Sequence, residues 1–258
     1  MSAPNFSSCT VQIQELRSRL KDVSETDPDF KEGFYLYYWL KAGKFNVDQA
    51  EDNIRENLKW REENDISHLR QMEYCPEIFK GFPFHRDGRS RNGMTVWRLN
   101  AGRFKFGEEL HKHGKEKVLL YWLQVLSKAE KAFIENTRDL IKSGVDPSEI
   151  CEWPLNKKNW CILNMEGMNY SELLSKKTVM FFVNLVRITV NYFPFLDGTA
   201  CFVNAGKLME MFFKLARPFF KGSNVDMIVF DSNKAKWKDV IFEHIDPLEI
   251  PALAKDCE

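Results

Sequence analysis

The chain has 258 residues, and its 37 acidic and 37 basic side chains give a net charge of zero at pH 7. A balanced charge argues against a general nucleic-acid binder, which normally carries a basic excess. Aromatic residues make up 14% of the chain, which suits a large apolar interior or a pocket for a bulky hydrophobic guest. The length allows one large domain or two modest ones.

No feature of the sequence predicts secretion or a membrane span. The six cysteines are scattered and form no CxxC pair, so structural zinc and a disulfide framework are not expected. The start, MSAPNFSSCTVQ, lacks the basic and apolar regions of a signal peptide. The most apolar run, 179–193, is interrupted by polar residues and is shorter than the ~20 residues a bilayer span requires. We therefore expect a soluble, cytoplasmic protein.

The first third of the chain predicts helices. Asp27 and Pro28 can cap and begin one helix that stops at Gly43, and Asn46 with Gln49 resembles a capping box that opens the next. No strand pattern appears before residue 90, and the proline and glycine residues between 75 and 93 mark a break in composition. This break predicts a helical N-terminal domain over 1–75 and a second domain over 76–258.

After the break, strands and helices alternate. Short apolar runs predict strands, whereas helical periodicity predicts the segments between them. The predicted strands are 94–99, 160–165, 199–204 and 226–230, and the predicted helices are 108–142, 178–193, 207–221 and a short one that carries Trp237. Such alternation implies right-handed crossovers and a mostly parallel sheet, so the predicted fold class is α/β.

Segment 207–221 is unusually apolar for a helix. Its charges lie on one narrow stripe (Glu210, Lys214, Arg217 and Lys221), and nearly all the remaining circumference is apolar. A helix of this kind needs apolar contacts on two sides. The second contact can be protein, in which case the helix is wholly buried, or a partner that is not protein.

Motifs for catalysis are missing. The turns after the predicted strands match neither phosphate-binding pattern, and no GxSxG elbow is present. His111 and His113 are two residues apart and face different directions on a helix, which disfavours a metal site. We expect no enzyme activity, no cofactor and no metal. Asn164 and Asn204 are polar residues in apolar strands; they bond either to a neighbouring loop, which we favour, or to the polar end of a ligand.

Three segments resemble the CRAL-TRIO family of retinaldehyde, tocopherol and phosphatidylinositol carriers. LKAGKFNVDQAEDNIRENLKWREEN (40–64) resembles the family's N-terminal helical signature, and the loop at 87–89 before MTVW resembles the entry to its lipid domain. NYFPFLDGTACFVNAGKLMEMFFKLARPFF (191–220) resembles its most recognisable segment. The resemblance extends from about residue 28 to 250. Phosphoinositide-binding members carry Glu-Arg where this chain has Phe195 and Leu196, and Lys where it has Arg217.

The resemblance implies a helical N-terminal bundle followed by a mostly parallel sheet that forms the floor of a hydrophobic cavity. Segment 207–221 would be the gate helix over that cavity, opening at membranes. The implied function is non-enzymatic binding and transfer, or sensing, of a phospholipid, retinoid, tocopherol or other terpenoid. The implied partners are this hydrophobic ligand and a transient membrane surface, with no nucleic acid, and the chain would be a monomer.

The alternatives are an interaction module with a collapsed pocket, which would bind a protein or a membrane, and, less favoured, an α/β enzyme. The predicted ligand-binding residues lie on the strands, on the helix before the third predicted strand and on the gate. They are Trp97, Asn159, Cys161, Leu163, Met165, Phe181, Tyr192, Phe202, Asn204, Met209, Phe212, Phe213, Ala216, Arg217 and Phe220.

Overall fold

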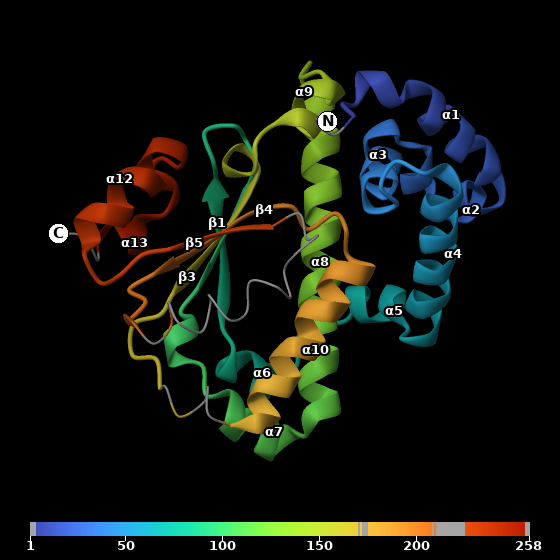
Figure 1. Cartoon of the computed structure of the whole chain (residues 1–258). Coiled ribbons are helices and arrows are strands. Elements are labelled where there is room, and N and C mark those ends of the chain that lie inside the picture. Colours follow the sequence, from blue (N-terminus) through green and yellow to red (C-terminus); the bar gives the residue numbers. More distant parts are fainter. Residues whose placement is uncertain (1–3, 170, 172–174, 208, 210–224, 256–258) are drawn as a thin grey trace.

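The computed structural model describes residues 4–169, 171, 175–207, 209 and 225–255 (Figure 1). Within these residues a group of N-terminal helices lies on one side of the long helix α8, and a five-stranded sheet lies on the other side. The predicted α/β class is therefore confirmed.

The N-terminal part is helical, as predicted. Its α-helices are α1 (Thr10–Arg19), α2 (Lys21–Thr26), α3 (Gly33–Ala42), α4 (Val47–Glu63), α5 (Ile66–Gln71) and α6 (Pro76–Gly81), with short 3-10 helices at Ser7–Cys9 and Pro28–Lys31.

The predicted caps hold with two differences. Asp27 caps only the 3-10 turn at Pro28–Lys31, and the α-helix begins at Gly33 and ends at Ala42, with Gly43 as its C-cap. Asn46 caps α4 by accepting the N–H of Gln49 at 2.9 Å. The amide of Gln49 donates to Asn53 at 2.9 Å rather than returning to the cap, so the capping box is half formed.

The five strands are β1 (Phe84–Arg89), β2 (Thr95–Leu99), β3 (Asn159–Asn164), β4 (Gly198–Val203) and β5 (Val225–Val229), and they lie in that order in the sheet. Strands β2 to β5 are parallel, as predicted. The expectation of no strand before residue 90 is wrong, because β1 pairs antiparallel with β2. As an edge strand of polar residues, FHRDGR, it carries no alternating apolar pattern.

The remaining helices of the described ranges are α7 (Phe106–His113), α8 (Lys115–Lys142), α9 (Pro147–Glu152), α10 (Lys176–Tyr192), α12 (Lys234–His244) and α13 (Pro251–Lys255), with 3-10 turns at Ala101–Arg103, Leu155–Lys157 and Pro247–Glu249. The prediction of one helix over 108–142 is wrong. Gly114 adopts φ +83°, a left-handed conformation that an α-helix cannot contain, and so separates α7 from α8. Of the predicted helix 207–221, all residues except Lys207 and Met209 lie outside the described residues.

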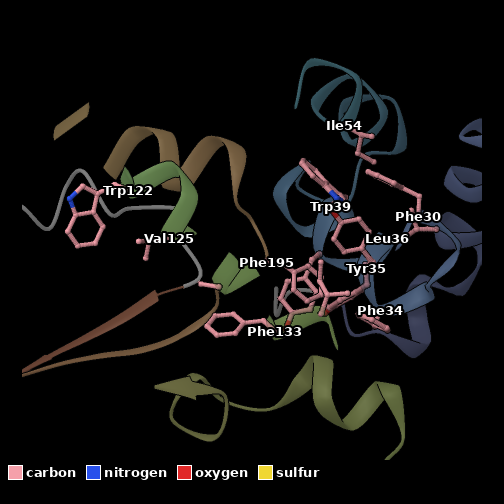
Figure 2. Packing of buried hydrophobic residues seen from close by; sticks show 14 of the residues in the cluster. Phe30, Phe34, Tyr35, Leu36, Trp39, Ile54, Trp122, Val125, Phe133 and Phe195 are labelled. Atoms are coloured by element: carbon pink, nitrogen blue, oxygen red, sulfur yellow. The ribbon is translucent and has the colours of Figure 1, made fainter. Parts of the chain in front are cut away.

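One large apolar core joins the two parts of the chain. It contains buried side chains of α1, α3, α4 and α8 together with Trp97 and Phe195, and Figure 2 shows Phe195 and Phe133 close to Tyr35 of α3. The ring of Phe195 packs against three aromatic residues of α3, which are Phe34, Tyr35 and Tyr38. The helical part thus shares its core with the sheet, and the domain boundary after residue 75 stays a prediction. No helix of the described ranges is long and apolar enough to cross a membrane.

Candidate functional site

The sheet presents two rows of side chains on the face opposite α12. Trp97, Cys161, Ala200 and Met227 lie in register across β2 to β5, and Leu99, Leu163, Phe202 and Val229 form the next row. Because side chains alternate along a strand, these eight residues share one face. We call them the apolar floor.

The two faces of the sheet differ in burial. On the back face, the apolar residues of β2 to β4 are 0% exposed and pack with α12 and the residue after it, whereas Ile228 on the edge strand β5 is partly exposed; the fully buried residues are Val96, Trp160, Ile162, Cys201 and Val203, packed with Trp237, Ile241 and Ile245. On the floor, only Trp97 and Leu99 are buried, and the other six residues keep accessible surface. Apolar surface left in contact with water is unfavourable, so a face of this kind is typical of a surface that receives another molecule.

Cys161 illustrates the environment of the floor. Burial raises the pKa of its thiol to about 12, yet the residue retains accessible surface. The thiol is therefore protonated at neutral pH and contributes an apolar, unreactive surface to the middle of the sheet.

Helix α10 provides a second apolar surface. Val179, Val183, Val186 and Val190 recur at steps of four, three and four, which places them on one stripe of the helix. All four are partly exposed, and none belongs to the apolar clusters that the described residues form. The opposite side of α10 carries Phe181, which packs into the main core. We call the four residues the valine stripe.

At the C-terminal edge of the sheet, the two asparagines bond to each other. Asn204 Nδ2 donates to Asn164 Oδ1 at 2.9 Å, and the N–H of Glu166, in the loop after β3, donates to the same oxygen at 3.0 Å. Asn164 thus bonds to a neighbouring loop, the alternative that the sequence favoured, whereas Asn204 bonds to Asn164 and not to a loop in the described residues. Asn204 also lines an open pocket of about 360 Å³, together with Met165, Glu166, Gly167, Met168, Gly206, Ser232 and Lys234.

At the N-terminal edge, a buried polar network surrounds the start of β3. The ammonium of Lys158 donates to Asp197 at 2.7 Å, to the hydroxyl of Tyr38 at 2.6 Å and to the carbonyl of Cys151 at 3.3 Å. Tyr38 donates to the same carboxylate of Asp197. Burial, followed by the charge of Asp197, raises the pKa of Tyr38 well above its ordinary value. All three N–H donors of Lys158 are therefore used within the protein.

Two of the predicted ligand-binding residues take part in contacts within the protein. Asn159 is 5% exposed, and its amide nitrogen donates to the carbonyl of Asp197 at 3.2 Å, so it is bound to the buried network. Tyr192, at the end of α10, stacks on Trp60 of α4 and lies with the helices, away from the floor.

The other predicted residues divide into three groups. Trp97, Cys161, Leu163 and Phe202 lie together on the floor, and Met165 and Met209 cluster with Leu163 and Phe202 at its C-terminal edge. Phe181 faces the main core, which Trp97 joins. The gate residues Phe212, Phe213, Ala216, Arg217 and Phe220 lie outside the described residues.

The sequence-based prediction of ligand-binding residues missed half of the residues of the apolar floor. Leu99, Ala200, Met227 and Val229 were not predicted, although the alternation of each strand places them beside residues that were. The valine stripe was missed as well, and its seven-residue spacing was the signal that could have found it.

Comparisons with known proteins bear on the family and the fold. The model of the CRAL/TRIO domain family matches residues 79–254. The chain is 22% identical over 224 residues to Protein real-time of Aedes aegypti, covering 85% of this chain and 32% of that protein. It is 21% identical over 249 residues to Protein real-time of Anopheles gambiae, covering 93% of this chain and 34% of the mosquito protein. A CRAL-TRIO domain-containing protein of Caenorhabditis elegans is 20% identical over 219 residues, 84% of this chain and 29% of the worm protein.

The crystal structure of Sfh5 is similar in fold, with a TM-score of 0.64, 15% sequence identity and coverage of 93% of this chain and 85% of that one. This chain spans about a third of the length of the three curated relatives. The family match covers more than half of the chain and coincides with the sheet, the floor and α10. The chain belongs to the CRAL/TRIO domain family of lipid-binding and lipid-transfer proteins.

Proposed function

We propose that this chain is a non-enzymatic carrier or sensor that holds a hydrophobic ligand against the apolar floor. The observation that carries the proposal is the difference between the two faces of one sheet. Neighbouring residues of the same strand, such as Ala200 and Cys201, are partly exposed on the floor and 0% exposed on the back. A bound apolar molecule would give the floor the contact that α12 gives the back face.

The contacts around the floor support a ligand without a phosphoinositide headgroup. Lys158 has no N–H left for a phosphate, since Asp197, Tyr38 and Cys151 occupy all three. Phe195, which replaces an acidic residue of phosphoinositide-binding members, is 2% exposed and packed among the rings of α3. The ligand class proposed is therefore a phospholipid of another type, a retinoid, a tocopherol or another terpenoid.

The size of the hydrophobic effect explains why exchange would take place at a membrane. Burying a sixteen-carbon chain at ~0.8 kcal/mol per CH₂ is worth on the order of 13 kcal/mol before other costs. A ligand bound this tightly leaves into water very slowly, but it loses little when it passes into a bilayer. The proposal therefore includes a gate: the predicted helix 207–221 opens when the protein meets a membrane. It also includes a monomeric protein located in the cytoplasm.

Mass spectrometry of organic extracts tests the proposal directly. The chain is purified without detergent from two expression hosts, and lipids are quantified per mole of protein in native and in extensively delipidated samples. We expect one hydrophobic molecule per chain, restored by incubation of the delipidated protein with vesicles. If no lipid is bound from either host and none is taken up from vesicles, the alternative of an interaction module with a collapsed pocket replaces the carrier.

A further inference from the structure

We propose that the end of the molecule formed by α7 and by the starts of α8 and α10 docks on an anionic phospholipid bilayer. These three segments meet at one end of the molecule (Figure 1), and α7 contacts both α8 and α10. Five exposed lysines lie there: Lys112, Lys115, Lys117, Lys176 and Lys177. We call them the basic end. The inference rests on the proposed function, because it assigns the surface through which a carrier would meet its membrane.

The lysines of the basic end are free of carboxylate partners within the described ranges, since no ion pair there includes any of the five. The exposed arginines of the N-terminal helices differ in this respect. Arg19 is paired with Glu15, Asp48 and Glu51, and Arg55 is paired with Asp22 and Glu51. Three carboxylates lie in the same segments: Glu108 and Glu109 contact Lys105 and His113, and Glu116 lies between Lys115 and Lys117. Five lysines against these carboxylates leave an excess of positive charge at the basic end, although the whole chain is neutral.

The position of these lysines within their helices is unfavourable for stability. Lys115 and Lys117 lie in the first turn of α8, and Lys176 and Lys177 lie in the first turn of α10. The N-terminus of a helix carries a partial positive charge, so cations there destabilise the helix and anions stabilise it. Four lysines at two such positions are not explained by the stability of the fold, but they are suited to attracting a negatively charged surface.

An apolar side chain at the same place favours a bilayer over an acidic protein. Met180 follows Lys176 by one helical turn and is 54% exposed. Membrane-contacting surfaces usually combine lysines, which bind the lipid headgroups, with apolar side chains, which enter the boundary of the acyl chains. The valine stripe begins at this end with Val179 and Val183, so docking here brings the apolar side of α10 next to the bilayer.

Charge reversal separates docking from folding. In the variant with Lys115→Glu, Lys117→Glu, Lys176→Glu and Lys177→Glu, the new carboxylates lie where the helix termini favour them, so thermal stability should be unchanged or raised. Binding to vesicles of phosphatidylcholine and phosphatidylserine (7:3) should fall by at least roughly 100-fold, since each lysine contributes about a fivefold factor near an anionic surface. Wild-type protein should not bind vesicles of pure phosphatidylcholine.

A matched variant controls for net charge. Lys21→Glu, Lys31→Glu, Lys44→Glu and Lys59→Glu change four exposed lysines of the N-terminal part, and they should reduce vesicle binding by less than about threefold at physiological salt, where screening is strong. Met180→Asp should weaken binding about tenfold, whereas Leu248→Asp, at a position that is 86% exposed near the C-terminus, should have no effect.

Each result decides the inference. Equal losses of vesicle binding in the two charge-reversed variants would overturn it. Failure of the wild-type protein to bind anionic vesicles would also overturn it, and would point to an acidic protein as the partner of the basic end. The lipid content of the purified protein is measured in parallel. If the purified chain holds lipid but does not bind vesicles, only the docking surface is contradicted. If the chain binds vesicles but never holds lipid, only the carrier function is contradicted.

Discussion

Trp60 of α4 and Tyr192 of α10 stack face to face, with ring centroids 4.1 Å apart and an interplanar angle of 10°. Beside this stack, Arg61 donates to the carbonyl of Tyr192 at 2.9 Å and to both oxygens of Glu130 on α8 at 3.0 and 2.8 Å. Trp60 and Arg61, which lie in the segment 40–64 that resembles the family's N-terminal signature, thus hold the C-terminal end of α10 against α8. They support the helix that presents the valine stripe.

Loss of Arg61 should be strongly destabilising. Glu130 is 1% exposed, and Arg61→Met would remove the guanidinium that contacts both of its oxygens, which leaves Arg70, at 3.6 Å, as the ion-pair partner among the described residues. Removal of one member of a buried ion pair costs about 3–5 kcal/mol, and because Arg70 still compensates part of the charge of Glu130, the expected loss is about 3 kcal/mol. Urea unfolding at pH 7 should show a loss of this size.

Arg55→Met is the matched control for this change. Arg55 also lies on α4 and pairs with Asp22 and Glu51, but its side chain is 43% exposed, so its loss should cost less than about 1 kcal/mol. The double variant Arg61→Met/Glu130→Leu should recover part of the loss, since it removes both charges. Equal costs for Arg61→Met and Arg55→Met would contradict the role given to the buried pair.

The ion pairs of Asp29 predict an acid-sensitive contribution to stability. Burial alone would raise the pKa of Asp29, but hydrogen bonds from Arg138 and Lys131 outweigh it and hold the pKa below the ordinary 3.8. Because the carboxylate form is favoured in the folded state, its contribution is complete above the unfolded pKa and is lost as the pH falls through the folded pKa. The stability difference between wild type and Asp29→Asn should be constant above about pH 5 and shrink below about pH 4. A difference that stays constant to about pH 3 would contradict this.

The parallel strands were predictable because each is a short apolar run bounded by turn residues. Strand β4, for example, was predicted over 199–204 and spans Gly198–Val203. Strand β1 was not predictable in this way, since its polar sequence becomes a strand only through pairing with β2. The break at Gly114 was missed because glycine is tolerated inside helices, and only the backbone angle distinguishes a break from an interior position.

The site was predictable in part for a similar reason. Alternation within β3 and β4 identifies the side chains that share a face, and so Cys161, Leu163 and Phe202 were found together on the floor. What an individual polar residue contacts depends on segments far away in the chain. Asn159 was predicted to touch a ligand, but the network that holds its amide is assembled by Asp197 with Tyr38 of α3.

The cysteines should differ sharply in reactivity. Burial raises the pKa of the thiols of Cys151, Cys161 and Cys201 to about 12 in each case, whereas Cys75 is exposed. At pH 8, a thiol with a pKa near 12 is ionised in only about one molecule in ten thousand, so alkylation is very slow. After brief iodoacetamide treatment of the folded protein, peptide mapping should find Cys75 modified and the other three intact. Modification of Cys161 at the rate of Cys75 would contradict the environment described for the floor.

Substitutions at two neighbouring positions of β4 should affect different properties, one the lipid content and the other the stability of the fold. Ala200 lies on the partly exposed floor, and Cys201 lies on the fully buried back face. Ala200→Phe should fill space that the ligand uses, so it should lower the lipid content of the purified protein at least fivefold and change stability by less than about 1 kcal/mol. Cys201→Phe should overpack the contact with α12 at a cost of about 1–3 kcal/mol and leave the lipid content of the folded fraction unchanged.

The pair of variants separates the loss of a ligand site from general damage to the sheet. Both insert the same ring into the same strand, one residue apart, and differ only in the face that receives it. Extract mass spectrometry and urea unfolding of both proteins supply the two measurements. If Ala200→Phe destabilises the fold as much as Cys201→Phe and retains its lipid, then the floor is closed by the protein's own side chains, and the accessible surface of Cys161, Leu163 and Phe202 is not where the ligand lies.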